Sequence, residues 1–132
     1  MVDESDLCRL GDTPYGLTDL LGLRRTEIDG MYDGETCRCT PMDDSTLPET
    51  QASVLCEVAS LNDTDPATPL SVYAEDYYAN CPAVAVHSYG EGRAYYLASR
   101  FDEAFYRAFY RAAVKEVGLT PAWPEALPDG VL

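Results

Sequence analysis

One stretch constrains the fold of this chain more than any other, because it predicts three consecutive extended segments. Leu70 to Ala74 is short and extended, and a turn separates it from an alternating run, Pro82 to Ser88. Proline suits the head of a strand, where a missing N–H costs little. Tyr89-Gly90-Glu91-Gly92 then reverses the chain, since glycine permits the positive φ of a tight hairpin. Arg93 to Ala98 returns as the partner strand.

The strongest helical pattern follows directly, from about Asp102 to Val117. Ser99 with Asp102 three residues later resembles a capping box, and Gly118 predicts the end of the helix. Two apolar stripes adjoin: Phe101, Phe105, Ala108, Phe109 and Ala112 in the first, and Tyr106, Tyr110, Ala113 and Val117 in the second. The apolar arc is wide, so we expect a sheet to cover one side and a loop or another subunit to cover a second.

The first half of the chain predicts one helix and further extended segments. Pro14 to Leu21 is the helix candidate, with Thr13 as its N-cap and Gly22 as its stop. The other expected segments are an extended run from Arg24 to Tyr32, a loop from Thr40 to Thr50 and a strand from Ser53 to Leu61. In that strand, alternation places Val54, Cys56 and Val58 on one face.

Length and charge narrow the classes of protein that are possible. The 132 residues predict one small domain, or a piece of a larger one. The net charge of -14 argues against nucleic-acid and anionic-membrane partners, which attract clusters of Lys and Arg. No apolar run reaches the ~20 residues of a membrane span, and the acidic residues 1–6 lack a signal-peptide core. The odd number of cysteines, five, indicates reduced thiols. We therefore expect a cytoplasmic location.

A thiol, two carboxylates and the only histidine lie close together in the sequence, which raises the question of an enzyme. Cys81 and His87 could form a nucleophile and its base, with Glu75 or Asp76 orienting the histidine. However, a nucleophilic cysteine needs a lowered pKa, usually from a helix N-terminus or an imidazolium, and Cys81 precedes a proline in an extended stretch. These residues are better candidates for packing and for an interface.

Metal, phosphate and carboxylate chemistry have equally little support. Cys37-Arg38-Cys39 could be half of a zinc site, but no second Cys/His pair follows, and we expect the two thiols to point to opposite faces of a strand. Glu75 and Asp76 should diverge likewise, so they form no glycosidase pair. The Gly90–Gly92 turn joins strands, whereas a phosphate loop opens a helix. We expect no catalytic, cofactor-binding or metal-binding residue and no cofactor.

The aromatic composition indicates half-buried surfaces, as at subunit contacts, rather than a catalytic site. Ten tyrosines are present with few other aromatic residues. A tyrosine ring is apolar while its hydroxyl stays solvated, which is why tyrosine is enriched at subunit interfaces.

Several motifs, in this order, resemble the trimerisation domain of family 42 glycoside hydrolases, the bacterial β-galactosidases. They are Ser5-Asp6-Leu7-Cys8-Arg9-Leu10-Gly11, Leu20-Leu21-Gly22-Leu23, Glu27-Ile28-Asp29, Tyr73-Ala74-Glu75-Asp76-Tyr77-Tyr78-Ala79, Pro82-Ala83-Val84, Tyr89-Gly90-Glu91-Gly92-Arg93-Ala94-Tyr95-Tyr96, the helix from Asp102 to Gly118, and Pro128-Asp129-Gly130-Val131. The resemblance covers nearly the whole chain, and the hairpin motif is its most specific part.

The resemblance implies a fold and a function. The family domain is α/β and similar to the flavodoxin-like fold of class I glutamine amidotransferases, with a mixed β-sheet and flanking helices. Several β/α units of it would precede residue 1, so residues 1–132 would form a single partial domain, with residues 121–132 as an exit linker. The family's catalytic glutamates lie on a TIM barrel that this chain lacks, so no catalytic residue can be assigned by resemblance.

The resemblance therefore implies a non-catalytic trimerisation module of a retaining enzyme that hydrolyses terminal β-galactosides in carbohydrate metabolism. Its partners would be further copies of itself, with galactoside bound only through the absent barrel. One alternative is that the chain itself hydrolyses sugar. Another is a stand-alone, amidotransferase-like module for sugar binding or regulation.

Overall fold

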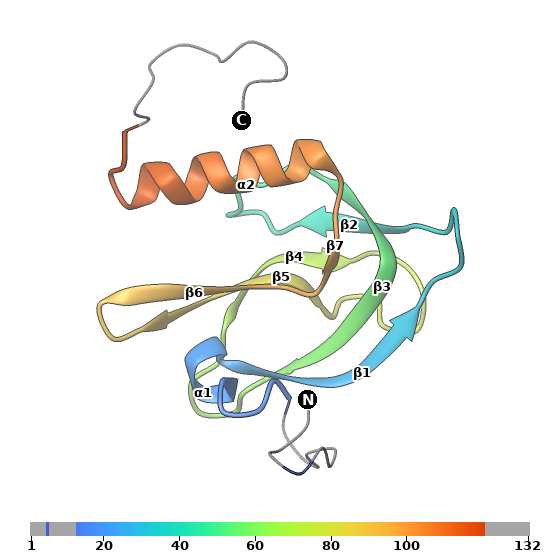
Figure 1. The fold of residues 1–132 in the computed structure, drawn as a ribbon, viewed down its shortest axis with the longest axis horizontal. Helices are drawn as coiled ribbons and strands as arrows, with labels where there is room; N and C mark the ends of the chain where they lie inside the picture. Colours follow the sequence, from blue (N-terminus) through green and yellow to red (C-terminus); the bar gives the residue numbers. More distant parts are fainter. Residues whose placement is uncertain (1–4, 6–12, 121–132) are drawn as a thin grey trace.

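The computed structural model describes residue 5 and residues 13–120, and it combines a curved antiparallel sheet with two helices (Figure 1). The elements are α1 (Thr18–Leu21), β1 (Leu23–Gly30), β2 (Cys37–Pro41), β3 (Thr50–Leu61), β4 (Thr68–Tyr73), β5 (Pro82–Tyr89), β6 (Gly92–Leu97), β7 (Ser99–Arg100) and α2 (Glu103–Glu116). The expected exit linker, 121–132, lies outside the described residues.

The sheet closes on itself in the manner of a small barrel. Its strands follow the order β1-β3-β2-β4-β5-β6, and β7 pairs back onto β3. The closure depends on Ala98, which joins β6 to β7: its N–H donates to the Ala83 carbonyl at 2.9 Å, and its carbonyl accepts from the Glu57 N–H at 2.8 Å. The long β3 therefore contacts β1, β2 and β7 along its length.

The expectation of a sheet with flanking helices is confirmed, and its pairing differs from a flavodoxin-like sheet. Every strand pair in the described residues is antiparallel. Parallel neighbours need a long crossover, usually a helix, and within residues 23–100 the strands follow one another without one. The two helices lie before β1 and after β7, so this part of the chain holds no parallel pair on which a doubly wound fold would depend.

The predicted strand–turn–strand stretch is confirmed. Pro82 begins β5, and Tyr89 pairs with Gly92 at the end of a hairpin in which Gly90 has a φ of 58°. The extended run before Asp33-Gly34 is β1. The expected loop from Thr40 to Thr50 is shorter than predicted, because β2 extends to Pro41 and β3 begins at Thr50.

The prediction that Val54 shares a face of β3 with Cys56 is wrong. Val54 has a φ of 72° and lies in a bulge of the β3–β7 pairing between Ser53 and Cys56. A bulge adds one residue and shifts the alternation of side chains by one. Val54 is therefore 53% exposed, while Cys56 is fully buried.

The prediction that Cys37 and Cys39 diverge is also wrong. Residues i and i+2 of a strand share a face, and both thiols are buried in the main core cluster. Tyr73 is fully buried in the same cluster, and its hydroxyl donates to the Ala98 carbonyl at 2.9 Å. A smaller cluster, Leu23, Ala59, Ala67 and Ala85, lies beside α1 with Leu21 packed against it.

The first helix is shorter than predicted, and Thr13 is not its cap. Thr13 forms a β-bridge with Arg25, and its hydroxyl donates to the Arg25 carbonyl at 2.9 Å. A turn with Gly16 at a φ of 73° follows, so the helix begins only at Thr18. Its predicted end at Gly22 is confirmed, with a φ of 65°.

The second helix matches its predicted span, but Ser99 does not cap it. Ser99 belongs to β7, and its hydroxyl donates to the Leu55 carbonyl at 2.6 Å. Asp102 is the N-cap, since its Oδ1 accepts from the Phe105 N–H at 2.8 Å and its Oδ2 accepts from the Thr50 hydroxyl at 2.7 Å. One carboxylate therefore caps α2 and fixes it to the start of β3.

Replacing Asp102 by alanine is expected to lower the free energy of unfolding by about 1–2 kcal/mol, because the cap and the link to Thr50 are both lost. Asp102→Asn keeps a carbonyl acceptor and should cost less. The Phe105 N–H, followed by the Thr50 hydroxyl, lowers the pKa of Asp102. The stabilisation of the folded state by the ionised Asp102 carboxylate is therefore complete above the unfolded pKa of about 4. It is lost as the pH falls through the lower pKa of the folded state. Urea titrations of both variants at pH 7 and pH 3 test this, and equal losses for both variants at pH 7 would argue against it.

Candidate functional site

The cluster that raised the question of an enzyme is dispersed in the structure. Glu75 and Asp76 lie in the β4–β5 turn, where the Glu75 carboxylate accepts from the Arg38 Nε at 3.2 Å. Cys81 directly precedes β5, and His87 lies near the other end of that strand. Six residue-to-residue steps of extended chain place Cys81 and His87 about 20 Å apart. The structure therefore does not bring Cys81 and His87 together as nucleophile and base.

The buried thiols are poorly suited to nucleophilic chemistry. Burial raises the pKa of Cys37 to about 11 and that of Cys39 to about 12. Burial also raises the pKa of the Cys56 thiol, which lies 3.8 Å from the Met31 sulfur. A raised pKa keeps a thiol protonated at neutral pH, whereas nucleophiles and metal ligands act as thiolates. Across the part of the chain that is described, three or more His, Cys, Asp or Glu side chains nowhere converge as a metal site would require.

Sequence reasoning missed a half-buried polar cluster on β3. The Glu57 carboxylate accepts from the Arg25 Nη1 at 2.6 Å, and the Tyr96 hydroxyl donates to its other oxygen. Burial, and then the bond to Glu57, raise the pKa of Tyr96. This cluster ties together β1, β3 and β6. Its one sequence signal was a carboxylate within the apolar run from Val54 to Ala59.

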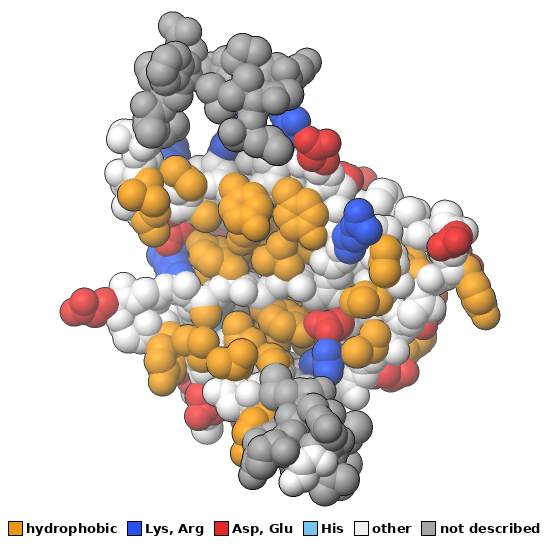
Figure 2. All heavy atoms as spheres, in the orientation of Figure 1, with side chains coloured by type: hydrophobic (Ala, Val, Ile, Leu, Met, Phe, Trp, Pro, Cys, Tyr) orange, Lys and Arg blue, Asp and Glu red, His pale blue; other side chains and the backbone are white. Residues whose placement is uncertain are grey.

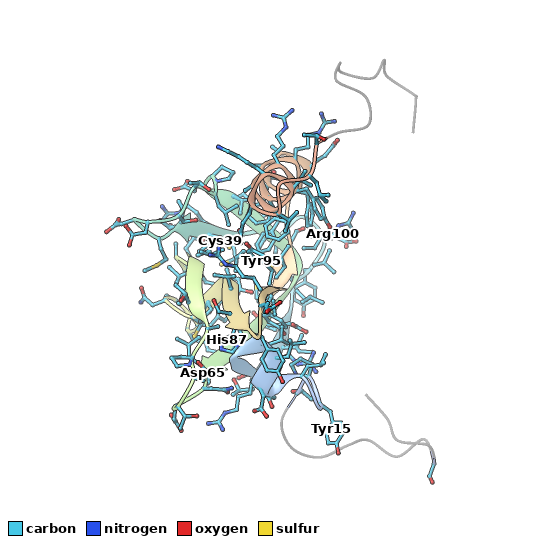
Figure 3. The ribbon with its side chains drawn as sticks, turned by 90° about the vertical axis from the view of Figure 1, so that its left-hand side faces the viewer. Tyr15, Cys39, Asp65, His87, Tyr95 and Arg100 are labelled. Carbon is cyan, nitrogen blue, oxygen red and sulfur yellow. The ribbon has the colours of Figure 1, made fainter. Side chains whose placement is uncertain are left out.

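A second polar cluster fixes the far end of α2 to the sheet. The Glu116 carboxylate accepts from the Tyr95 hydroxyl at 2.7 Å and pairs with the Arg93 Nη1 at 2.8 Å. Figure 3 shows Tyr95 beneath the helix. Because Asp102 holds the start of α2, the helix is anchored at both ends.

One flank of α2 is apolar, and we call it the α2 surface: Tyr106, Tyr110, Val114 and Val117. Tyr110 is 61% exposed and Val117 is 68% exposed, and the rings of Tyr106 and Tyr110 stack with centroids 6.5 Å apart. The first predicted stripe of the helix behaves differently, since Phe101, Phe105 and Phe109 are buried in the main core cluster. Among the described residues, the β2–β3 loop packs Leu47 into the same cluster as Phe109, but nothing covers Tyr110 and Val117.

The α2 surface continues onto the sheet. Tyr106 lines an open hollow of about 280 Å³ together with Val54, Leu55 and Leu97. Figure 2 shows hydrophobic side chains gathered over α2 and over the strands next to it, with a few acidic and basic groups between them. Val54 contributes to this region because the bulge in β3 turns it outward. The apolar band thus combines a helix with parts of two strands.

Strand β6 adds a free sheet edge. Among the described strands, β6 pairs only with β5. Because the Ala98 N–H donates to Ala83, alternate residues along β6 face β5, and the backbone groups of Arg93, Tyr95 and Leu97 point away from it. A free row of backbone donors and acceptors is a template for pairing with another strand.

Known proteins are similar to this chain in sequence and in fold. Residues 1–120 match the family described as the β-galactosidase trimerisation domain. The chain is 41% identical, over 134 aligned residues, to the β-galactosidase BglY of Alicyclobacillus acidocaldarius, covering 99% of this chain and 19% of that protein. It is 33% identical to the β-galactosidase Pbg of Clostridium perfringens, again covering 99% of this chain and 19% of the relative. The chain thus spans about a fifth of the length of these relatives.

Solved structures agree with the sequence comparison. The β-galactosidase from Rahnella sp. R3 superposes with a TM-score of 0.88 at 39% identity, over 98% of this chain and 19% of that one. The β-galactosidase from Bacillus circulans sp. alkalophilus superposes with a TM-score of 0.85 at 29% identity, over 96% and 18%. The sequence and fold comparisons agree, and the chain belongs to the family of β-galactosidase trimerisation domains.

Proposed function

We propose that this chain is a non-catalytic assembly module, which holds copies of a β-galactosidase together by self-association. The observation that carries the proposal is the α2 surface, an ordered and anchored apolar surface without a second cover among the described residues. Clusters of exposed apolar groups with tyrosines are typical of protein–protein interfaces. The membership in a trimerisation family supports the same function.

The parent enzyme would hydrolyse terminal β-galactosides with a catalytic barrel outside this chain. Support comes from the relatives, which are β-galactosidases about five times as long as the matched part. The described residues form an antiparallel sheet with two helices, in which burial raises the pKa values of the Cys37 and Cys39 thiols, and Cys81 and His87 are far apart. These observations favour assembly over turnover in this part of the enzyme.

We also propose that the flavodoxin-like, amidotransferase-like character belongs to a larger domain. The free edge of β6 supports this, since it can accept further strands, including parallel ones.

No helix of the described residues is long and apolar enough to cross a membrane. We propose a cytoplasmic location for the module, on the support of its free, buried thiols Cys37, Cys39 and Cys56.

Replacing Tyr110 by serine is expected to weaken self-association at least tenfold, since truncating an interface tyrosine often costs more than about 1–2 kcal/mol of binding. The matched control is Tyr32→Ser, which changes an 81% exposed tyrosine in the β1–β2 connection, outside the α2 surface. Light scattering over a concentration series gives the association constants. Equal weakening by both variants would show that the α2 surface is not the interface.

Titration calorimetry with galactose and lactose separates assembly from the sugar-binding alternative, because an assembly module should give no heat beyond dilution. A chromogenic galactoside addresses the enzymatic alternative, and turnover above the buffer rate would contradict the proposal.

A further inference from the structure

The only histidine of the chain is buried where three segments meet. His87 lies on β5 and is 4% exposed. Its Nδ1 is 2.9 Å from the carbonyl oxygen of Leu20 in α1, and its Nε2 is 3.3 Å from the Oδ2 of Asp65 in the β3–β4 turn. Figure 3 shows His87 and Asp65 next to each other at this end of the molecule. One side chain therefore connects a strand, a helix and a turn.

Gly22 completes this junction. A Cβ at Gly22 would come within 2.6 Å of the His87 ring, so the backbone at the end of α1 packs directly on the imidazole. The Gly22 carbonyl in turn accepts from the N–H groups of Asn62 and Ala67, at 3.0 and 2.9 Å, on either side of the β3–β4 turn. The imidazole, Gly22 and the turn thus form one packed unit.

The partners of the ring fix its chemistry. A carbonyl oxygen can only accept, so the Nδ1 of His87 must carry a proton. In the neutral ring the Nε2 is then a bare lone pair facing the Asp65 carboxylate. This Nε2 is a buried atom without a hydrogen-bond partner in the described structure, since the 3.3 Å contact is within ion-pair range but lacks hydrogen-bond geometry. Protonation would turn an unsatisfied, repulsive contact into a charged pair.

The charged groups on the neighbouring elements make the site predominantly acidic. Asp19 lies on α1 next to Leu20, and Asp63 and Asp65 lie in the β3–β4 turn. Arg93 on β6 is the one cation that lines the hollow shared by His87 and Asp65, and it pairs with Glu116. Asp65 is therefore the carboxylate that faces the ring directly.

We propose that His87 is a proton-operated latch, which fastens the β3–β4 turn to strand β5 when its ring is charged and loosens the turn when it is neutral, while the bond to Leu20 holds α1 in both states. A loosened latch leaves the Leu20 bond and the packing on Gly22 in place, but it removes the attraction of Asp65. The regulated unit is the β3–β4 turn, which is held to the Gly22 carbonyl by the N–H groups of Asn62 and Ala67 and lies at the opposite side of the sheet from α2 (Figure 1).

The pH range of the latch follows from its contacts. The bond to the Leu20 carbonyl raises the pKa of His87, burial opposes this, and Asp65 raises it further. A raised pKa means that the folded protein binds the proton more tightly than the unfolded chain does. The stabilisation is complete below the ordinary value of about 6.5 and is lost as the pH rises through the higher folded value. The latch is therefore closed below about pH 6.5 and opens as the pH rises above the folded pKa of His87.

The titration of His87 can be followed directly by NMR, because the chain contains a single histidine. Asp65→Asn is expected to lower its pKa, whereas Asp63→Asn, the same change of charge two residues away in the same turn, should lower it less. In the wild-type chain, the amides of Asn62 and Ala67 should lose protection from hydrogen exchange as the pH rises through the His87 titration, after correction for intrinsic rates. His87→Asn keeps a donor near the position of Nδ1 but cannot ionise, so the dependence should disappear.

Three results would overturn the latch. They are a wild-type pKa at or below about 6.5, equal effects of Asp65→Asn and Asp63→Asn, or amide protection at Asn62 and Ala67 that does not follow the titration. Asp65 is 81% exposed at its side chain, so Asp65→Asn tests the proposal even if His87→Asn fails to fold. None of these measurements depends on self-association.

Discussion

Replacing Phe105 by alanine is expected to lower the free energy of unfolding by about 3–5 kcal/mol, a loss typical of a truncated buried phenylalanine. Phe105 is fully buried, and its ring lies 4.5 Å from that of Phe101 and 6.1 Å from that of Phe109, measured between centroids. It is the central member of the stripe that joins α2 to the sheet. Removing it leaves a cavity where the helix and the sheet meet, and neither element can move in to fill it because both ends of α2 are anchored.

Chemical denaturation followed by circular dichroism measures this loss, at a protein concentration low enough to keep the chain monomeric. Tyr110→Ala is the matched control, because it truncates an aromatic residue on the same helix that is 61% exposed. It should change stability by less than about 1 kcal/mol. Similar losses for the two variants would mean that α2 does not pack on the sheet through the Phe105 stripe.

Replacing Gly22 by alanine is expected to cost about 2–5 kcal/mol, as the sum of backbone strain and overpacking. Gly22 has a φ of 65°, which disfavours any residue with a Cβ. The added Cβ would also meet the backbone nitrogen of Ala67 at 2.6 Å and the ring of His87 at 2.6 Å. Backbone cannot move aside as a flexible side chain can, so the clash adds to the strain.

Gly34→Ala separates these two effects. Gly34 has a φ of 87° but nothing within 4 Å of an added Cβ, so its variant suffers only the strain of about 1–2 kcal/mol. Thermal unfolding of both variants gives the comparison. If Gly22→Ala lost no more stability than Gly34→Ala, the close packing at the end of α1 would be ruled out.

The parts of the fold that were predictable from the sequence have local causes. Pro82, Gly90 and Gly118 each mark a boundary through their own backbone preferences, and each lies where the sequence indicates. The helical stripe of Phe101, Phe105 and Phe109 predicted the buried side of α2 for a similar reason. Spacing along the chain decides such features before any tertiary contact forms.

The parts that were not predicted depend on distant residues. Ser99 and Asp102 were both plausible at the start of α2, and only the pairing of β7 with β3 assigns Ser99 to a strand. The same pairing produces the bulge that exposes Val54. The bonds of Glu57 to Arg25 and Tyr96 join residues 32 and 39 positions apart, which no local pattern can indicate.

The candidate site was predicted in kind but not in extent. The width of the apolar arc on α2 predicted a second cover by a loop or by another subunit; the loop residue Leu47 packs with Phe109, and the structure leaves Tyr110 and Val117 exposed. The contributions of Val54 and Leu97 could not be foreseen, because both depend on how β3 and β6 pack beside the helix. His87 was noted as a candidate base, and its contacts with Leu20 and Asp65 give it a different role.

Sedimentation equilibrium of the wild-type chain tests self-association most directly. One chain has a mass of 14.5 kDa, and the apparent mass should rise above this value with concentration, toward an integral multiple of it. Tyr110→Ser should move the rise to higher concentration. An apparent mass of 14.5 kDa at every concentration, for a chain that circular dichroism shows to be folded, would contradict the assembly function.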